Sequence, residues 1–279
     1  MTAATSDRAE KSILITGAGG SLGSAAAREF ISRGWRVFAA DISADVLPEG
    51  AFPVLMDVTD TESVERAAAE VAARTDGLDA LLHLAGVYTM DPFAEIPEDE
   101  LKRMLDVNLM GVYRVTRAAL PLVRNAGGRI IIVASELAPL DPLPFNGIYS
   151  MTKRALDGYA HSLALELDLI GTRVITVYPG AFGDGMTKSA IRAMDRMSGT
   201  TRLYPGITER FRDIVVKQTG GAKDPRVLAA FLCRIAGKKR PRFRYFINNS
   251  WKLRLFSALP MDLQAAALRL LLKGDKRSR

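Results

Sequence analysis

The sequence predicts a single α/β domain, a doubly wound parallel sheet with a basic helical C-terminal extension. Three observations predict this fold. Short apolar runs alternate with helical patterns over residues 11–180, a glycine-rich turn follows the first run, and Tyr149 and Lys153 stand at i and i+4 near the start of a later helix. Alternation of strands and helices is typical of a parallel sheet with helices on both faces.

Each element follows from a local pattern. Near-continuous apolar runs predict parallel strands, which are buried on both faces, at 12–16, 35–40, 52–56, 78–84, 129–134, 172–178 and 244–247. Helix formers predict helices at 22–33, 61–74, 97–124, 149–169 and 225–236. Residues 181–222 have weak periodicity and predict no regular element, whereas 250–273 predict two short amphipathic helices divided at Pro260. One domain is expected over 1–279, with a cofactor-binding and catalytic core at 11–180 and a substrate-side and C-terminal segment at 181–279.

Composition excludes several classes of protein. The 279 residues are 48% hydrophobic and 25% charged, which is ordinary for a globular domain and excludes a disordered or low-complexity chain. The one cysteine cannot build a disulfide framework or a zinc cluster, and no metal site is expected. The polar N-terminus shows no signal peptide, and no apolar run approaches a membrane span. A cytoplasmic protein is expected.

The net charge of +7 is unevenly distributed. Residues 1–185 hold 16 Lys and Arg against 25 Asp and Glu, whereas 186–279 hold 22 against 6. A basic C-terminal part indicates nucleic acid, an anionic membrane or a merely solvated face. No nucleic-acid motif is present, so nucleic acid is not an expected partner. Peripheral membrane contact through 249–279 remains open beside a role as a cover for the substrate pocket.

The glycine-rich turn Thr16-Gly17-Ala18-Gly19-Gly20-Ser21-Leu22-Gly23 joins the first strand to the first helix. Glycine permits a tight turn and a close backbone approach to a pyrophosphate, and free N–H groups at the helix start hold the anion. The turn therefore predicts a Rossmann-like dinucleotide site, with contacts from five residues: Gly17, Gly20, Ser21, Leu22 and Gly23.

An acidic residue, Asp41, follows the second strand. A carboxylate there accepts hydrogen bonds from the ribose hydroxyls and repels a 2′-phosphate. Neither Lys nor Arg occurs at 18–22, and Ile42 follows the acid. NAD is therefore expected rather than NADP.

Tyr149-Ser150-Met151-Thr152-Lys153 places a tyrosine and a lysine on one face of a helix. A tyrosine with the ordinary pKa of about 10 is a poor base at neutral pH. A neighbouring ammonium favours the phenolate, as does the positive nicotinamide of an oxidised cofactor. The spacing therefore predicts an acid–base pair.

These motifs in order resemble the short-chain dehydrogenase/reductase superfamily. Classical members carry T-G-x-x-x-G-x-G, but here Ser21 interrupts the pattern, and the glycines fit T-G-x-x-G-x-x-G, the spacing of the extended subfamily. His83-Leu84-Ala85-Gly86 likewise departs from the usual N-N-A-G in its first two residues. Overall length and the helix after Tyr149 resemble the classical subfamily.

The resemblance implies further site residues. Ser135 would polarise the substrate oxygen, Asn108 would support a water and proton relay, and Lys153 would hold the ribose beside Tyr149. Thr187 is a candidate for the nicotinamide carboxamide, and His83 is expected to be structural. Cofactor contacts are also implied for residues that follow strands: Asp57 and Val58 at the adenine, Ala85 and Gly86 where close approach is needed, and Pro179 and Gly180 beside the nicotinamide.

The leading hypothesis is an oxidoreductase that transfers a hydride between NAD(H) and a lipophilic secondary alcohol or ketone. A lipophilic substrate is expected because the family's pocket segments here carry apolar side chains, among them Leu143, Phe145, Phe182 and Met186.

Two alternatives remain open. The glycine spacing favours an extended-type NAD-dependent sugar-nucleotide epimerase or dehydratase, and the basic C-terminal part is compatible with a non-catalytic NAD-sensing or membrane-associated scaffold. That C-terminal part weakly resembles steroid- and retinol-dehydrogenase-like members. The family also implies a homodimer or homotetramer, paired through the helices that contain 98–124 and 149–170.

Overall fold

A seven-stranded, all-parallel sheet forms the centre of the molecule in this computed structural model, which describes residues 10–183, 185–219 and 222–273. The strand order is β3-β2-β1-β4-β5-β6-β7, so the chain reverses direction across the sheet between β1 and β4. Ligands bind at such a switch point, beyond the carboxyl ends of the strands. The strands are β1 (Ser12–Thr16), β2 (Arg36–Asp41), β3 (Phe52–Leu55), β4 (Ala80–His83), β5 (Arg129–Val133), β6 (Arg173–Pro179) and β7 (Arg244–Ile247).

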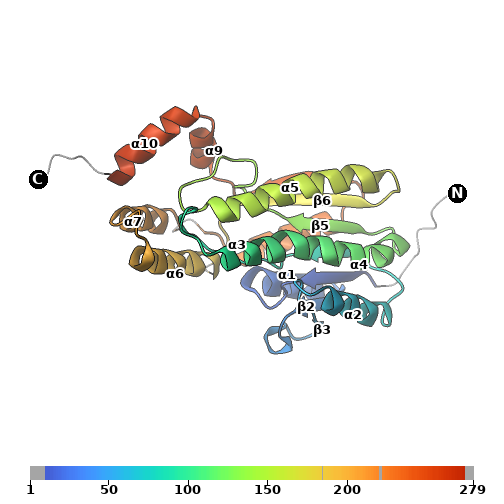
Figure 1. The fold of residues 1–279 in the computed structure, drawn as a ribbon. Coiled ribbons are helices and arrows are strands. Elements are labelled where there is room, and N and C mark those ends of the chain that lie inside the picture. The colour runs from blue at the N-terminus through green and yellow to red at the C-terminus, as the bar shows by residue number, and fades with distance from the viewer. Residues whose placement is uncertain (1–9, 184, 220–221, 274–279) are drawn as a thin grey trace, which may run out of the picture.

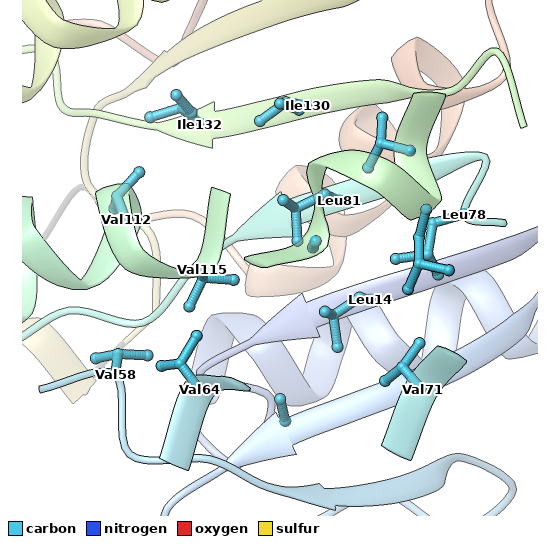
Figure 2. Packing of buried hydrophobic residues seen from close by; sticks show 14 of the residues in the cluster. Leu14, Val58, Val64, Val71, Leu78, Leu81, Val112, Val115, Ile130 and Ile132 are labelled. Atoms are coloured by element: carbon cyan, nitrogen blue, oxygen red, sulfur yellow. The ribbon is translucent and has the colours of Figure 1, made fainter. Parts of the chain in front are cut away.

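Helices cover both faces of the sheet (Figure 1). One face packs against α2 (Thr61–Ala72), α4 (Gly111–Asn125) and α5 (Gly147–Asp168), and the other against α1 (Ser21–Ser32) and α8 (Pro225–Ala236). Successive strand residues point to opposite faces, so Leu14 and Ile130 join the first layer, whose packing Figure 2 shows, while Ile13 and Ile131 join the second. The predicted fold class is confirmed.

The helix predicted over 97–124 is divided in the structure. It consists of α3 (Glu98–Leu105), a π-helical turn (Asp106–Met110) and α4. A π-helical turn inserts one residue into the helical repeat and is frequent at functional sites. Here it contains Asn108.

The prediction of no regular element at 181–222 is wrong. Two helices, α6 (Gly185–Thr200) and α7 (Ile207–Thr219), lie beyond the carboxyl edge of the sheet (Figure 1). Ala190, Met194 and Met197 are buried there and do follow a helical period. Packing within an apolar cluster that also contains Phe145 and Phe211 stabilises the helix.

The C-terminal extension forms the two predicted helices, α9 (Trp251–Ser257) and α10 (Met261–Lys273), after β7 has paired with β6. Both lie on the side of the molecule that carries α6 and α7 (Figure 1). Within the described residues, no single helix is long and apolar enough to cross a membrane. Only α9 and α10 taken together reach that length and hydropathy, and the pair is bent by 120°.

Candidate active site

The glycine-rich turn has the backbone geometry of a close-approach site. Gly17 has a φ of 68°, in the left-handed region, and a Cβ there would lie 2.6 Å from the backbone nitrogen of Ala85. A Cβ on Gly23 would lie 2.0 Å from the carbonyl oxygen of Gly17. Both positions therefore require glycine. A Cβ on Gly20, the N-cap of α1, would meet only that oxygen, at 3.4 Å, so this position leaves open space above the turn.

The first turn of α1 supplies donors to this open space. Ser21, Leu22 and Gly23 occupy the helical positions whose N–H groups have no intrahelical acceptor. Together with the helix dipole, these groups attract an anion. The structure thus brings together the five turn residues that the sequence predicts as a pyrophosphate site.

Asp41 lies beside the turn, at the end of β2. Its carboxylate accepts hydrogen bonds from the backbone nitrogens of Gly19 (2.9 Å) and Ile42 (2.8 Å), which fix its position. Asp57 follows the neighbouring strand β3 at the same edge, but its carboxylate accepts hydrogen bonds from the backbone nitrogen and hydroxyl of Thr59. The Asp57 carboxylate therefore stabilises a local turn, and Val58 packs against Gly111 in the core.

Thr16 is a site residue that sequence reasoning did not single out. Its hydroxyl accepts hydrogen bonds from the backbone nitrogens of Leu84 (3.3 Å) and Ala85 (3.2 Å), so it joins the end of β1 to the segment after β4. These two hydrogen bonds hold Ala85 and Gly86 against the glycine-rich turn, at the switch point of the sheet. His83 is buried one step earlier, with its Nε2 3.1 Å from the Thr116 hydroxyl, and burial lowers its pKa to about 3. It is therefore a neutral structural residue, as expected.

Three side chains form the predicted catalytic group. Ser135 follows β5, whereas Tyr149 and Lys153 lie in the first two turns of α5, and all three are buried. A hydrogen bond between the Ser135 and Tyr149 side chains lowers the Tyr149 pKa, but burial outweighs it and raises that pKa to about 12. The nearby Glu136 carboxylate raises it further. Tyr149 is therefore a neutral phenol here.

The expected effect of Lys153 on Tyr149 is not observed in this structure. The Lys153 Nζ donates to the carbonyl oxygen of Val133 at 3.1 Å and lies 5.8 Å from the centroid of the Tyr149 ring. Burial lowers the Lys153 pKa to about 8, because it disfavours the charged form. Desolvation is therefore the largest influence on the pKa of each group, and Lys153 is not among the groups that shift the Tyr149 pKa.

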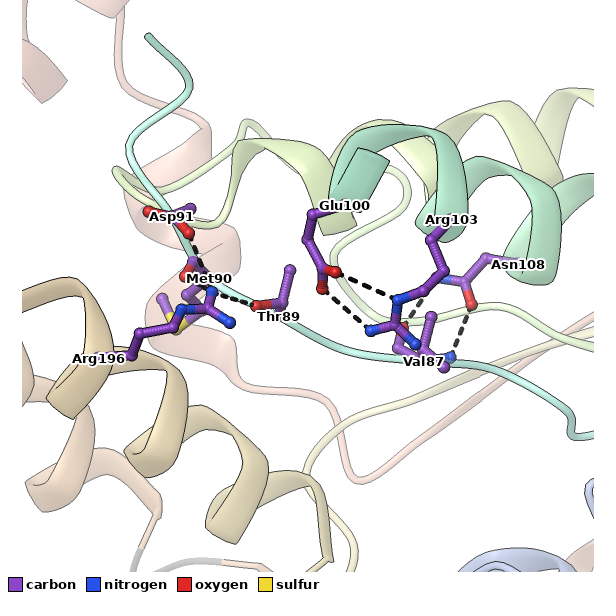
Figure 3. Close-up of polar contacts among 8 residues, drawn as sticks. All are labelled: Val87, Thr89, Met90, Asp91, Glu100, Arg103, Asn108 and Arg196. Carbon is purple, nitrogen blue, oxygen red and sulfur yellow. Dashed lines mark hydrogen bonds and ion pairs between the residues drawn. The ribbon is translucent and has the colours of Figure 1, made fainter. Parts of the chain in front are cut away.

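Asn108 connects the π-helical turn to two neighbouring segments. Its Oδ1 accepts a hydrogen bond from the backbone nitrogen of Val87 (2.8 Å), and its Nδ2 donates to the Val87 oxygen (2.9 Å) and the Thr152 hydroxyl (3.2 Å). Figure 3 shows the paired contacts with Val87. Since Thr152 precedes Lys153, the Asn108 side chain positions the catalytic helix against the segment after β4.

Pro179 ends β6, and Gly180 follows it next to the predicted catalytic group. The Gly180 nitrogen donates to the Ile247 oxygen at 2.9 Å, and a Cβ there would lie 2.0 Å from the carbonyl oxygen of Asn248. Gly180 therefore permits the close approach of the chain after β7. The Pro179 oxygen accepts a hydrogen bond from the Glu136 nitrogen (2.9 Å), which ties this turn to the residue after Ser135.

The predicted pocket residues separate into two groups. Phe145 is buried beside Tyr204 and Phe211, with ring centroids 5.3 Å and 5.2 Å away, and Leu143 lies in the same loop. Phe182 instead packs in the core layer under α1 and α8 and does not contact that group. It is therefore a core residue, and its prediction as a pocket residue is wrong. The side chains of Met186 and Thr187 lie outside the described part of the structure.

A cavity of about 310 Å³ lies beside Phe145. Its lining is mostly apolar, with two cationic side chains from α10, and consists of Pro92, Phe93, Pro144, Phe145, Tyr204, Ile207, Leu268, Arg269, Leu272 and Lys273. Segments from the loop before α3, the loop before α5, α7 and α10 therefore border it, and Ser135, Tyr149 and Lys153 are not among its lining residues. The sequence left open a role for 249–279 as a cover for a pocket, but no local pattern shows which loop a terminal helix will meet.

Tyr88 and Glu136 are two further residues of the site that the sequence did not reveal. The Tyr88 ring lies edge-on to Tyr149, with centroids 4.7 Å apart, and burial and Tyr149 raise its pKa. Glu136 follows Ser135 and accepts a hydrogen bond from the Ser250 nitrogen (2.6 Å), while burial raises its pKa. Among the described residues, no group of His, Cys, Asp or Glu is arranged to hold a metal ion.

Residues 11–195 match the family model for the short chain dehydrogenases. A 3-ketodihydrosphingosine reductase of Bacteroides thetaiotaomicron is 29% identical over 83% of this chain and 86% of its own length. Retinol dehydrogenase 7 of Rattus norvegicus is 33% identical over 74% of this chain and 66% of its own length.

Solved structures show the same architecture. A short-chain dehydrogenase from Streptomyces avermitilis, 25% identical, superposes with a TM-score of 0.73 over 94% of each chain. A second one, from Burkholderia cenocepacia in complex with NADP, is also 25% identical, with a TM-score of 0.69 over 94% of this chain and 98% of that one.

Proposed function

This chain belongs to the short chain dehydrogenase family of oxidoreductases, and we propose that it interconverts a lipophilic secondary alcohol and its ketone with NAD(H). The family supplies hydride transfer with a nicotinamide cofactor. The substrate class, the choice of NAD and the roles of single residues are our proposal. The observation that carries it is the buried group of Ser135, Tyr149 and Lys153 at the carboxyl edge of the sheet.

The described residues fit a bound dinucleotide. The open space above Gly20 and the first turn of α1 suit a pyrophosphate, and the small residues Ala85 and Gly86 leave room where β4 ends. Asp41 would hold the ribose hydroxyls of the adenosine half, and Lys153 those of the nicotinamide half. When bound, the nicotinamide donates or accepts the hydride.

The preference for NAD rests on Asp41. Its carboxylate lies at the end of β2, where the 2′-phosphate of NADP would introduce a second negative charge. The residue after it, Ile42, is 70% exposed and supplies no cation to offset that repulsion. A solved relative binds NADP, so both cofactors belong in the test.

The chain's own groups account for the proton transfers. The neutral Tyr149 phenol donates a proton to the substrate oxygen during ketone reduction, and Ser135 donates a hydrogen bond to the same oxygen. Lys153, with a pKa of about 8, exchanges protons near neutral pH and supplies positive charge close to the tyrosine. In the oxidation direction the same proton returns to Tyr149.

The cavity beside Phe145 supports a lipophilic substrate. Aromatic and aliphatic side chains surround it, so water leaves the cavity when an apolar chain enters. One relative is named as a reductase of a keto lipid, and another as a dehydrogenase of retinol, a lipophilic primary alcohol.

The proposal is tested by a coupled assay over lipophilic alcohols and ketones, with sugar nucleotides alongside, using NAD(H) and NADP(H) in parallel. We expect a lower KM for NADH than for NADPH. Tyr149→Phe should bind NADH normally and lose about 10²–10⁴-fold in kcat, because the proton donor is removed.

Tyr113→Phe serves as the control, since Tyr113 is 41% exposed on α4. It should leave turnover unchanged. Full activity of Tyr149→Phe would contradict the assigned role of Tyr149, and turnover of sugar nucleotides alone would contradict the substrate class.

A further inference from the structure

The outward side of α10 is apolar. Leu263, Ala266, Ala267 and Leu270 recur at helical spacing on one side, and the Leu263 and Leu270 side chains are 55% and 81% exposed. Leu271 flanks this side and is 61% exposed. A surface helix of a globular protein normally presents polar residues outward. The apolar outer side of α10 is therefore a surface without a partner in the described structure.

The inner side of α10 is already engaged with the body of the protein. Leu272 is buried in the cluster that contains Phe145 and Phe211, and Gln264 donates to the Asp141 carboxylate at 2.8 Å. The carbonyl oxygen of Leu272 accepts a hydrogen bond from Arg210 at 2.8 Å. The outer leucines therefore have a defined direction, away from the core.

The adjoining helix α9 extends the apolar surface. Trp251 and Leu255, one turn apart, are 69% and 61% exposed, and Met261 at the start of α10 is 84% exposed. Hydrogen bonds hold α9 at both ends, from the Ser250 nitrogen to Glu136 and from the Asp141 nitrogen to the Ser257 hydroxyl. We define the docking surface as the exposed apolar residues of the two helices: Trp251, Leu255, Met261, Leu263, Leu270 and Leu271.

Charge identifies the partner. The two helices carry four cationic residues, Lys252, Arg254, Arg269 and Lys273, all exposed, against one acidic residue, Asp262. A second copy of the chain packed on the same surface would bring like charges together. An anionic lipid surface instead offers hydrocarbon to the leucines and the tryptophan, and phosphate to the cations.

We propose that α9 and α10 dock on an anionic lipid membrane, lying in its interface with the docking surface inserted. The 120° bend between the helices places them along an interface rather than across a bilayer as one straight span. The inner side of α10 contributes Leu268 and Leu272 to the cavity, so docking brings the wall of that cavity close to the lipid. The proposal concerns attachment and does not depend on the proposed reaction.

Flotation of the full chain with vesicles tests the proposal. We expect the protein to float with vesicles of phosphatidylcholine and phosphatidylglycerol, more weakly with phosphatidylcholine alone, and more weakly at high salt, because salt screens the cations. The double variant L270E/L271E should bind about 100-fold more weakly, since two inserted apolar side chains become charged. The double variant K252Q/R254Q should bind about tenfold more weakly.

Leu55→Glu provides the matched control. Leu55 is 64% exposed on β3, at the edge of the sheet opposite β7, and its substitution should leave flotation unchanged. Tyr149→Phe should float like the unmodified chain, which separates attachment from catalysis. No flotation on either vesicle would overturn the proposal. So would L270E/L271E converting a dimer into a monomer, because the surface would then be covered by a second copy.

Discussion

The chemistry of single residues in the site depends on burial more than on neighbouring charge. Tyr149 and Lys153 have the spacing of an acid–base pair, yet the pKa of the phenol rises to about 12 and that of the ammonium falls to about 8. Both shifts disfavour the charged form of the group. A neutral phenol is the form required to donate a proton to a carbonyl oxygen.

Glu136 is the residue that links this group to the C-terminal extension. Its negative charge raises the Tyr149 pKa, while its carboxylate accepts the Ser250 hydrogen bond. Glu136→Gln keeps an acceptor for that bond and removes the charge. We expect the Tyr149 pKa to fall, so that ketone reduction, which needs the protonated phenol, loses activity at a lower pH. The alkaline limb of the kcat/KM profile measures this change.

Asp141→Asn is the control for that experiment. Asp141 lies in the same loop and also contacts the extension, through Gln264, but it is not among the groups that shift the Tyr149 pKa. The alkaline limb of the kcat/KM profile of Asp141→Asn should lie at the same pH as in the unmodified enzyme. If Glu136→Gln leaves the limb where it is in the unmodified enzyme, the electrostatic link between Glu136 and Tyr149 is wrong.

At the scale of elements, polar contacts fasten α6 to the loop before α3. Arg196 donates to the Thr89 hydroxyl and to the Asp91 carboxylate, both at 2.9 Å, as Figure 3 shows. Glu95 accepts hydrogen bonds from the Thr201 hydroxyl (2.6 Å) and the Arg202 nitrogen (2.8 Å) at the end of the helix. The buried methionines of α6 thereby stay packed on Phe145, beside the cavity.

Replacement of Arg196 tests this fastening. Arg196→Gln leaves the nearly buried Asp91 carboxylate without its ion pair, so we expect a loss of about 1 kcal/mol in the free energy of unfolding by urea. We also expect a higher KM for the lipophilic substrate, with a smaller change in kcat, because the pocket wall moves while the catalytic group stays. Arg192→Gln, whose arginine contacts Ser189 on the same helix, should change neither quantity. Equal stability and KM for both variants would show that Arg196 does not hold the helix.

At the scale of the whole molecule, a second exposed apolar surface lies along the C-terminal part of α5. Leu165 and Leu169, one turn apart, are 59% and 87% exposed, and Tyr113 of α4 is 41% exposed. The family resemblance implies pairing of subunits through these two helices. We propose a homodimer or homotetramer that buries this surface, which is distinct from the docking surface on α9 and α10.

Light scattering coupled to gel filtration checks the assembly. Leu165→Glu should weaken association about 100-fold. A symmetric interface contains the substituted residue from both subunits, so two apolar contacts become charged. Leu203→Glu, at a residue 61% exposed between α6 and α7, should leave the mass unchanged. A monomeric unmodified protein would contradict the assembly and would leave the fold assignment intact.

The fold class follows from local sequence patterns, which also predict the cofactor edge and the catalytic group. These depend on local patterns: buried strands are continuous apolar runs, Gly17 and Gly23 stand where backbone contacts leave no space for a Cβ, and Tyr149 and Lys153 share a helix face. Each pattern lies within a few residues along the chain. Its physical meaning therefore does not depend on distant segments.

The tertiary structure brings together segments that lie far apart in the sequence. It placed Phe182 in the core, formed α6 from a weakly periodic segment, joined Glu136 to Ser250 and brought α10 to the cavity beside Phe145. It also raises the Tyr149 pKa, because desolvation depends on how much of the chain surrounds a group. Such contacts join residues more than 100 positions apart, as between Glu136 and Ser250, and no local pattern encodes them.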